Sequence, residues 1–212
     1  KDTKQLATPL KYNKSLEGLD QDLLIPLSLT FETPVQLNDS FPIQLCDTNN
    51  LPLEGYKVYL DSSTKQIITI EYPWVEQTKM HLIVPKNGIS DTLRNTLLKS
   101  DTLRFITKST SSYGASLIRI SGYQQFINPI LLLTKDDKVL YSYPITKNLL
   151  NIPLLPPNEY TLKILEDRNG NGIWDTGKYN LQKRQPEIVH ILKDNLLIKP
   201  NWENELNLTI NK

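Results

Sequence analysis

Short runs of leucine, β-branched and aromatic residues, each bounded by turn residues, recur along almost the whole chain. The strand-like runs are residues 23–31, 41–45, 56–60, 66–72, 79–84, 103–107, 115–121, 130–134, 138–143, 159–165, 187–192, 195–199 and 205–210. No long stretch carries apolar side chains at helical spacing. Prolines fall at the edges of the early runs, at positions 26, 34, 42, 52, 73 and 85. Because proline is tolerated at strand ends and sheet margins, this pattern predicts an all-β protein.

A polar cluster at residues 108–112 interrupts the strand-like pattern. The chain on each side of it has about 100 residues, which is the usual size of an immunoglobulin-like β-sandwich. The sequence therefore predicts two consecutive β-sandwich domains, residues 22–109 and 110–212. Residues 1–21 are polar and rich in Lys, Asp and Gln, which favours a linker from an absent upstream domain. Since the sequence opens at Lys1 without a signal peptide, we expect a processed form or an excised fragment.

Charge and composition exclude several classes of protein. The 24 Lys and Arg residues nearly balance the 23 Asp and Glu residues, so the net charge of +1 gives no electrostatic basis for binding nucleic acid. The single Cys46 excludes an intramolecular disulfide and thiolate zinc sites, and His81 and His190 are too far apart in sequence for a His-rich metal centre. The longest apolar runs, such as residues 129–133, are far shorter than the roughly 20 residues that cross a bilayer. We therefore expect no direct membrane insertion of this segment.

Residues 167–175, with the sequence DRNGNGIWD, have the spacing of a calcium-binding loop. Alternate residues of such a tight turn point inward, and a glycine stands at its sixth position. The candidate ligands are the side chains of Asp167, Asn169, Asn171 and Asp175 and the backbone carbonyl of Ile173. Lys178 occupies the twelfth position, where an EF-hand carries a bidentate Glu. Calcium would therefore bind weakly unless Glu187 or Glu166 completes the shell.

The same loop has two interpretations without a metal. Asn and Gly adopt left-handed conformations readily, and Asx side chains can bond the backbone of a metal-free loop. Alternatively, the loop and the following Trp174 and Tyr179 could rest against the sandwich edge as a structural clasp. The sequence leaves all three interpretations open.

Three tryptophans, Trp74, Trp174 and Trp202, are candidates for stacking against a sugar ring or a partner protein. Trp74, beside Pro73 and ahead of a polar stretch, is the best placed of them to be exposed. Strand alternation also favours core packing for most of the aromatic residues, because these supply sandwich cores with large apolar area. A glycan-binding surface and a packed core therefore both remain open.

Catalytic motifs are absent from the sequence. It contains no Gly-x-Ser-x-Gly elbow, no glycine-rich phosphate loop and no His-Glu-x-x-His pair. His81 and His190 both lie within strand-like runs, and Cys46 lies in an apolar run where a thiol is usually buried and inert. The sequence therefore predicts a protein that is not an enzyme.

Two sets of motifs resemble known families. In the first half, residues 27–35 (LSLTFETPV), 80–91 (MHLIVPKNGISD) and 104–107 (RFIT) are similar to the bacterial Ig-like domain first named in an S-layer protein, although Met80 or His81 replaces the usual aromatic. The second half resembles the C-terminal region of a Bacteroidetes family of Ig-like-domain outer-membrane lipoproteins. The residues that carry this second resemblance are 154–162 (LLPPNEYTL), 166–177 (EDRNGNGIWDTG), 185–187 (QPE) and 201–203 (NWE).

This resemblance implies an architecture and a location. It implies an Ig-like sandwich followed by a transthyretin- or carboxypeptidase-regulatory-like sandwich, on the periplasmic or cell-surface side of an outer membrane. The leading hypothesis is therefore a non-catalytic scaffold or docking segment that binds outer-membrane or cell-surface proteins. The alternatives are a carbohydrate-binding or adhesin-like module and accessory domains of a larger exported enzyme. We expect the last strand, within residues 202–210, to be available to a partner because it ends the chain.

Overall fold

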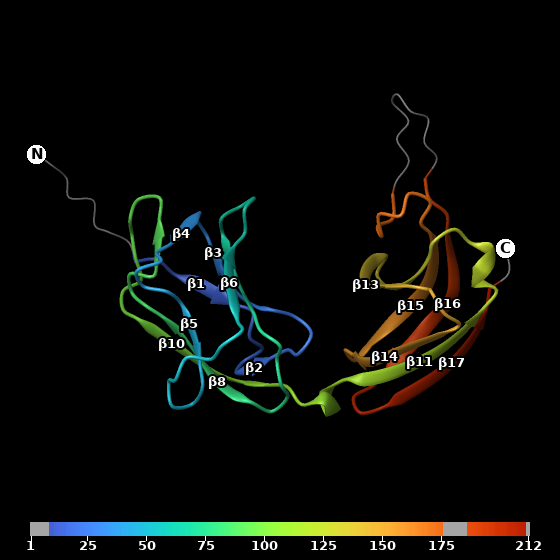
Figure 1. Cartoon of the computed structure of the whole chain (residues 1–212), viewed down its shortest axis with the longest axis horizontal. Coiled ribbons are helices and arrows are strands. Elements are labelled where there is room, and N and C mark those ends of the chain that lie inside the picture. The colour runs from blue at the N-terminus through green and yellow to red at the C-terminus, as the bar shows by residue number, and fades with distance from the viewer. Residues whose placement is uncertain (1–8, 176–185, 211–212) are drawn as a thin grey trace, which may run out of the picture. The chain divides into compact units, whose positions relative to one another are not determined.

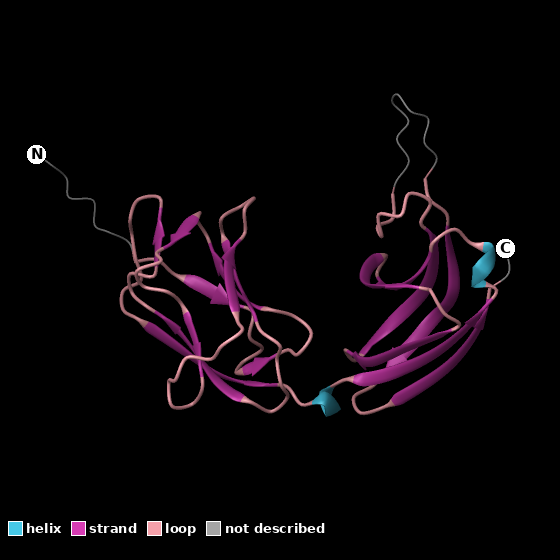
Figure 2. Cartoon of the chain, viewed as in Figure 1, coloured by secondary structure: helices cyan, strands magenta, loops and turns pink. Residues whose placement is uncertain are grey.

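The computed structural model describes residues 9–175 and 186–210, and strands fill most of this part of the chain (Figures 1 and 2). Two single turns of 3₁₀ helix, η1 (Thr110–Ser112) and η2 (Tyr123–Gln125), are the only helical elements among these residues. The all-β prediction is therefore confirmed. The chain divides into two compact units, Lys1–Ser109 and Thr110–Lys212. In the described ranges, no helix is long and apolar enough to cross a membrane.

The first unit is built from short strands. They are β1 (Tyr12–Lys14), β2 (Asp20–Gln21), β3 (Leu27–Phe31), β4 (Val35–Leu37), β5 (Gln44–Cys46), β6 (Lys57–Leu60), β7 (Ile67–Glu71), β8 (Lys79–Val84), β9 (Ile89–Asp91) and β10 (Asp101–Thr107). Two four-stranded sheets have the orders β1-β3-β7-β6 and β2-β10-β8-β5, and β4 pairs with β9. This is the immunoglobulin arrangement, in which strands A, B, E and D form one sheet and C, F and G the other. The short β2 is added parallel to β10.

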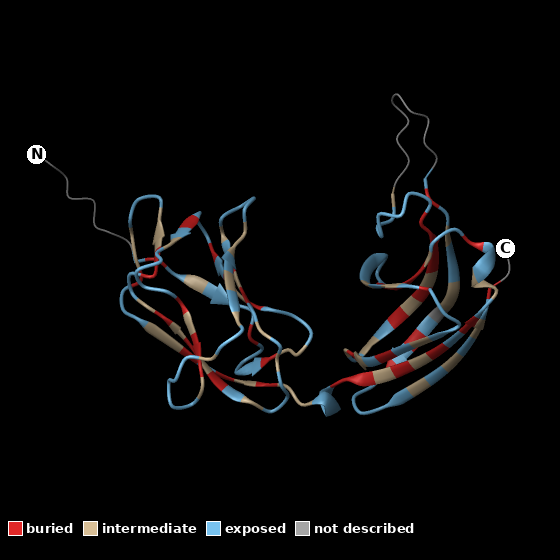
Figure 3. Ribbon diagram, viewed as in Figure 1, coloured by how far each residue is buried: buried red, intermediate tan, exposed pale blue. Residues whose placement is uncertain are grey.

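The strands of the first unit alternate between core and surface (Figure 3). In β8, Met80, Leu82 and Val84 are buried while the residues between them are more exposed. In β7, Ile68 and Ile70 follow the same pattern. Because successive side chains of a strand point to opposite faces, this alternation turns one apolar face of each sheet toward the other.

The linker prediction for residues 1–21 is wrong in its described part, residues 9–21. β1 pairs antiparallel with β3, and β2 pairs with β10. Leu10 and Leu16 belong to the core of the first unit, each 9% exposed. The segment has a polar composition because β1 and β2 are short strands at sheet edges, where one flank and one face meet solvent. Residues 1–8 lie outside the described residues.

Three aspartates hold turns of the first unit by accepting hydrogen bonds within their own loops. Asp47 accepts the N–H groups of Asn49 and Leu51, Asp61 accepts the N–H and hydroxyl of Thr64, and Asp91 accepts the N–H groups of Leu93 and Asn95 and the Asn95 amide. These hydrogen bonds favour the charged carboxylate and lower the pKa of all three groups below their usual value of 3.8.

The first unit should therefore lose stability in acid. A carboxyl group whose pKa is lower in the folded state stabilises the fold above its unfolded pKa, and this contribution is lost as the pH falls through the folded pKa. We expect the calorimetric melting temperature to fall as the pH is lowered from about 5 to 2. The triple variant Asp47→Asn, Asp61→Asn, Asp91→Asn should show a flatter profile, because it lacks these ionisations. An equally steep fall in this variant would contradict the assignment.

The second unit has longer strands. They are β11 (Gly114–Ser121), β12 (Pro129–Lys135), β13 (Lys138–Pro144), β14 (Leu149–Leu155), β15 (Asn158–Glu166), β16 (Val189–Ile198) and β17 (Glu203–Thr209). One sheet has the order β14-β11-β17 and the other β13-β12-β15-β16. Lettered along the chain, these sheets are D-A-G and C-B-E-F, the transthyretin-like order expected for this half. β11 and β17 are parallel, and the remaining pairs of the unit are antiparallel.

The core of the second unit lies between its two sheets. Leu131, Leu133, Tyr160, Leu162 and Ile164 are buried in it. The other face of β12 contributes to a smaller cluster, which contains Ile130, Leu132 and Leu165 with Val189 packed against it. β12 is therefore buried on both faces, which explains its nearly continuous apolar sequence.

Candidate functional site

The candidate calcium loop follows β15 and is organised around Asp167, which is 3% exposed. One carboxylate oxygen, Oδ1, accepts the backbone N–H groups of Gly170 and Asn171 at 2.8 and 3.2 Å. The other, Oδ2, accepts the N–H of Gly172 at 2.8 Å. Gly170 and Gly172 have φ angles of +73° and +76°, which glycine adopts without a steric cost. The buried carboxylate thus closes the loop on its own amides.

The two asparagines of the loop bond both the backbone and Asp175. The side-chain oxygen of Asn169 accepts the N–H of Asn171, and that of Asn171 accepts the N–H of Ile173, both at 2.9 Å. Both amide nitrogens donate to Oδ2 of Asp175, that of Asn171 at 3.1 Å. The structure therefore brings Asp167, Asn169, Asn171 and Asp175 together in one loop, while the Ile173 side chain is exposed.

Glu187 fastens this loop to the start of the next strand. Its carboxylate accepts the N–H of Arg168 at 3.0 Å and the N–H of Asp175 at 3.1 Å, and it is only 5% exposed. Its own N–H donates to the carbonyl of Asp175, and its carbonyl accepts the indole N–H of Trp174 at 3.1 Å. The buried Glu166 forms an ion pair with Arg168. The loop is therefore held at both ends by buried carboxylates.

These residues fit a calcium ion incompletely. The amide nitrogens of Asn169 and Asn171, rather than their oxygens, face Asp175. Because calcium takes oxygen ligands, both amides would have to turn over before they could bind the ion. Within residues 9–175 and 186–210, no group of three or more His, Cys, Asp or Glu residues is arranged to hold a metal. Lys178 and Tyr179 lie outside the described residues. The geometry favours the structural clasp over the calcium site.

Replacing Asp167 with alanine tests this preference. The variant leaves three backbone N–H groups without their acceptor, so we expect the free energy of unfolding of the second unit to fall by about 2 kcal/mol. Urea denaturation of both proteins, in EDTA and in millimolar calcium, measures the difference. A structural clasp gives the same loss in both solutions. A larger loss in calcium, with heat released when calcium is added to the unchanged chain, would instead establish the calcium site.

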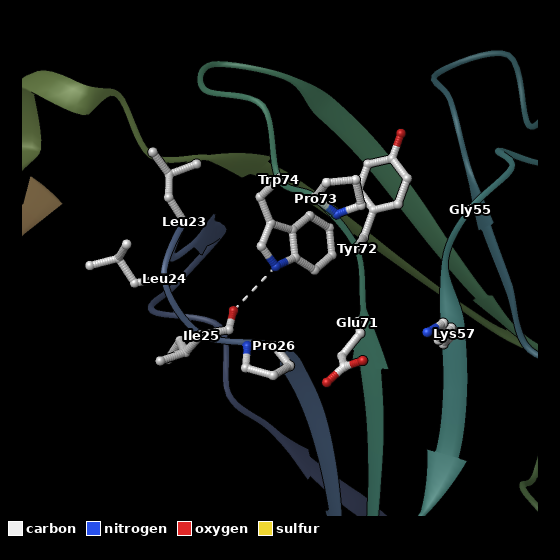
Figure 4. Close-up of a pocket in the computed structure, with 10 residues that line it drawn as sticks. All are labelled: Leu23, Leu24, Ile25, Pro26, Gly55, Lys57, Glu71, Tyr72, Pro73 and Trp74. Carbon is white, nitrogen blue, oxygen red and sulfur yellow. Dashed lines mark hydrogen bonds between the residues drawn. The ribbon is translucent and has the colours of Figure 1, made fainter. Parts of the chain in front are cut away.

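Trp74 lines a pocket of about 480 Å³ in the first unit (Figure 4). Its ring packs edge-to-face against Tyr72 and Phe105, at centroid distances of 5.4 and 5.9 Å. Its indole N–H donates to the carbonyl of Ile25 at 3.2 Å. Trp74 is half-buried, so the expectation that it is the most exposed tryptophan is wrong. Trp74 comes shortly after the end of β7, and its ring is partly buried because it packs against Phe105 of the facing sheet.

The polar wall of this pocket was not indicated by the sequence. Lys57 and Glu71 lie opposite each other on β6 and β7, and both line the pocket. The Tyr59 hydroxyl donates to Glu71 at 2.6 Å. Neither residue belongs to a motif, and only the strand register places them beside Trp74. The pocket thus combines two aromatic rings, Tyr72 and Trp74, with one cation and one carboxylate.

The other two candidate tryptophans are more exposed but do not share a surface. Trp174 is 46% exposed and Trp202 is 55% exposed. Trp174 bonds Glu187 just before β16, and Trp202 follows the end of β16. A strand of this length spans roughly 30 Å, so the two rings lie near opposite ends of the sheet. The ammonium group of Lys199 lies 4.4 Å from the centre of the Trp202 ring.

The residues considered for catalysis occupy structural positions. Cys46 is fully buried and forms no disulfide. His81 lies in β8, where its Nδ1 is 2.8 Å from the side-chain oxygen of Asn50. His190 lies in β16 and packs edge-to-face against Phe126. These placements agree with the strand positions predicted for both histidines.

Comparisons with known proteins give only distant similarities. No protein-family profile matches the chain, and no curated protein matches it. The chain is similar to native alpha-2-macroglobulin from Escherichia coli, in a crystal structure spanning domains MG0-NIE-MG1, with 13% identity and a TM-score of 0.39 over 87% of this chain and 70% of that one. It is also similar to the Bacillus anthracis TIE protein, with 11% identity and a TM-score of 0.27 over 94% of this chain and 40% of that one. Neither similarity assigns a function to the chain.

Proposed function

We propose that the chain is a non-catalytic docking segment of an exported outer-membrane lipoprotein, part of a complex with outer-membrane or cell-surface proteins. One observation carries this proposal. The last strand, β17, is the edge of its sheet and pairs with β11 alone within the described residues. An edge strand presents a row of free main-chain groups that a strand of a partner can pair with. The family resemblance of the second half supports the proposed location.

The free side of β17 can be assigned residue by residue. The N–H of Ala115 donates to the carbonyl of Trp202, and the N–H of Ile210 donates to the carbonyl of Ser121. In a parallel pair of strands, every second residue of a strand forms its main-chain hydrogen bonds with the same neighbouring strand. The even-numbered residues of β17 therefore bond β11, and the main-chain groups of odd-numbered residues such as Asn207 point away from it.

The variant Asn207→Pro tests the docking edge. Proline removes an outward N–H, which an edge strand tolerates, so the sandwich should remain folded. The control Asn207→Ala removes the same side chain and keeps the N–H. The full-length protein and its Ala variant should co-purify the same outer-membrane proteins from native cells, and the Pro variant should lose them. Equal recovery by all three proteins, or purification of the unchanged protein without any partner, would contradict the proposal.

A second candidate function is carbohydrate binding, which the pocket at Trp74 favours. Sugar sites combine an aromatic platform with a few polar groups, and here Tyr72 and Trp74 lie beside Lys57 and Glu71. A glycan array on the whole chain tests it. Binding that is lost in Trp74→Ala and in Glu71→Gln would support this function, and an array without any signal would remove it. Glu71→Gln keeps the aromatic packing, so its loss of binding would not reflect misfolding.

A further inference from the structure

A groove of about 700 Å³ lies in the first unit beside β1 and the beginning of β10. We call it the leucine groove and define it by its lining residues: Leu10, Lys11, Tyr12, Asn13, Lys14, Leu16, Gly18, Leu97, Leu98, Lys99, Asp101 and Leu103. Leu10, Leu16, Leu97 and Leu103 are 5–9% exposed and reach the core, whereas Leu98 is 72% exposed. The groove therefore has an aliphatic floor that is continuous with the core and one leucine that projects into solvent.

The groove is bordered by the edges of both sheets. β1 is the edge of its sheet and pairs only with β3 in the described part of the chain. β10 pairs with β2 only at Ile106 and Thr107, so its first residues have β8 on one side and no described strand on the other. The Tyr12 hydroxyl donates to Asp101 at 2.7 Å and joins the two edges. Main-chain groups of two strand edges thus border an apolar floor.

The charge of the groove is strongly one-sided. Lys11, Lys14 and Lys99 are exposed on its walls, and Asp101 is the single carboxylate among the residues that define it. An adjoining hollow of about 220 Å³ shares Leu97 and Leu98 with the groove and is lined by two further cations, Lys86 and Arg94. The whole chain has a net charge of only +1, so five cations beside one carboxylate are a local concentration.

Hydrogen bonding leaves these cations available. Asp101 is engaged by the Tyr12 hydroxyl. Glu17 is the first acidic residue after β1 in the sequence, and it forms an ion pair with Lys108 at 2.7 Å. The ion pairs between described residues involve Lys108, Arg119, Lys163 and Arg168 and none of the five cations of the groove and hollow. A negatively charged ligand would therefore meet five cations that form no ion pair with another described residue, against the single negative charge of Asp101.

We propose that the leucine groove binds an extended acidic peptide segment of a partner protein. Apolar side chains of the peptide pack on the leucine floor, its carboxylates meet Lys11, Lys14 and Lys99, and its backbone runs along the edge of β1. The two strand edges favour a peptide over nucleic acid or an anionic lipid, because only a peptide can pair with main-chain groups. This inference rests on the proposed docking function and adds a second surface and a chemical class of partner.

Fluorescence anisotropy with three labelled ten-residue peptides tests the inference on the whole chain. The probe alternates Glu and Val, the first comparator replaces every Glu by Gln, and the second replaces every Val by Ser. The groove variant is Lys11→Glu, Lys14→Glu, Lys99→Glu. The control variant, Lys79→Glu, Lys138→Glu, Lys147→Glu, changes the net charge equally at exposed positions outside the groove. Exposed substitutions of this kind rarely change the stability of a domain much, and thermal melting checks that both variants are folded.

We expect the Glu–Val peptide to bind the unchanged chain and the control variant with equal affinity. The groove variant should bind this peptide roughly tenfold or more weakly, and the unchanged chain should bind both comparator peptides more weakly by a similar factor. Added salt should weaken binding of the Glu–Val peptide. The inference would be overturned if the two variants bound the probe equally or if the unchanged chain did not bind it. It would also be overturned if a single-stranded oligonucleotide or phosphatidylserine vesicles, instead of the peptide, bound in a groove-dependent way. If the probe fails while Asn207→Pro still abolishes co-purification, the groove is rejected and the docking function stands. If the probe binds while Asn207→Pro has no effect on co-purification, docking through β17 is rejected and the groove stands.

Discussion

Replacing Tyr160 with alanine is expected to lower the free energy of unfolding of the second unit by about 4 kcal/mol. Tyr160 is 1% exposed and lies on β15 within the core between the two sheets. Its ring packs edge-to-face against Tyr141 at 6.2 Å, and its hydroxyl donates to the carbonyl of Pro156 at 2.8 Å. Alanine removes the ring and leaves a cavity that the strands on either side cannot fill.

Native-state hydrogen exchange measures this loss within the second unit, because the slowest amides of β12 and β15 report its global unfolding. The matched control is Tyr160→Phe, which keeps the ring and removes the hydroxyl. Losing that single hydrogen bond should cost about 1 kcal/mol. If alanine costs no more than phenylalanine, the ring does not support the core in the way that its burial indicates.

Replacing Gly122 with alanine should cost about 3 kcal/mol, although it adds a single methyl group. Gly122 has a φ of +81°, and an added Cβ would lie 2.1 Å from the backbone carbonyl oxygen of Ile210. A residue with a side chain is strained in this left-handed conformation. The carbonyl cannot move away easily, because it accepts the Gln125 side-chain amide and the N–H of Ile210 donates to Ser121.

The variant Gly172→Ala separates the cost of a positive φ from the cost of a steric clash with Ile210. Gly172 also has a positive φ, +76°, but no atom of the described residues lies within 4 Å of an added Cβ. It should cost only the conformational strain, about 1 kcal/mol. Hydrogen exchange of β11 and β17 in both variants measures the difference. Equal losses would mean that Ile210 does not pack against Gly122.

The sequence predicted the strands that have a regular pattern and missed strands that are very short or interrupted, such as β1, β2 and β14. Residues 66–72 and 79–84 correspond closely to β7 and β8, because alternation is clear when one face of a strand is buried. β14 was missed, since Pro153 interrupts its run. The structure places β14 at a sheet edge, where a missing N–H is tolerated. β1 and β2 were assigned to a linker because strands of three and two residues are too short to show a period.

The candidate sites were predicted to different extents for a similar reason. The Asp167 loop could be predicted from the sequence because all its ligand candidates lie within nine residues, and a local turn brings them together. The pocket at Trp74 combines Ile25, Lys57 and Glu71, and the leucine groove combines residues 10–18 with residues 97–103. Strand pairing alone makes these segments neighbours, and a single sequence contains no signal for such contacts.

The sequence by itself determined the all-β class, the two sandwiches and the turn-forming loop, because these follow from local periodicity and from turn chemistry over a few residues. The tertiary structure decided which residues become surfaces. In the structure, Trp74 packs against Phe105, the amide nitrogens of Asn169 and Asn171 donate to Asp175, and β17 lies at the edge of its sheet among the described strands. The physical reason is that burial and edge position depend on the register between strands distant in sequence, and that register is set by packing of the whole core.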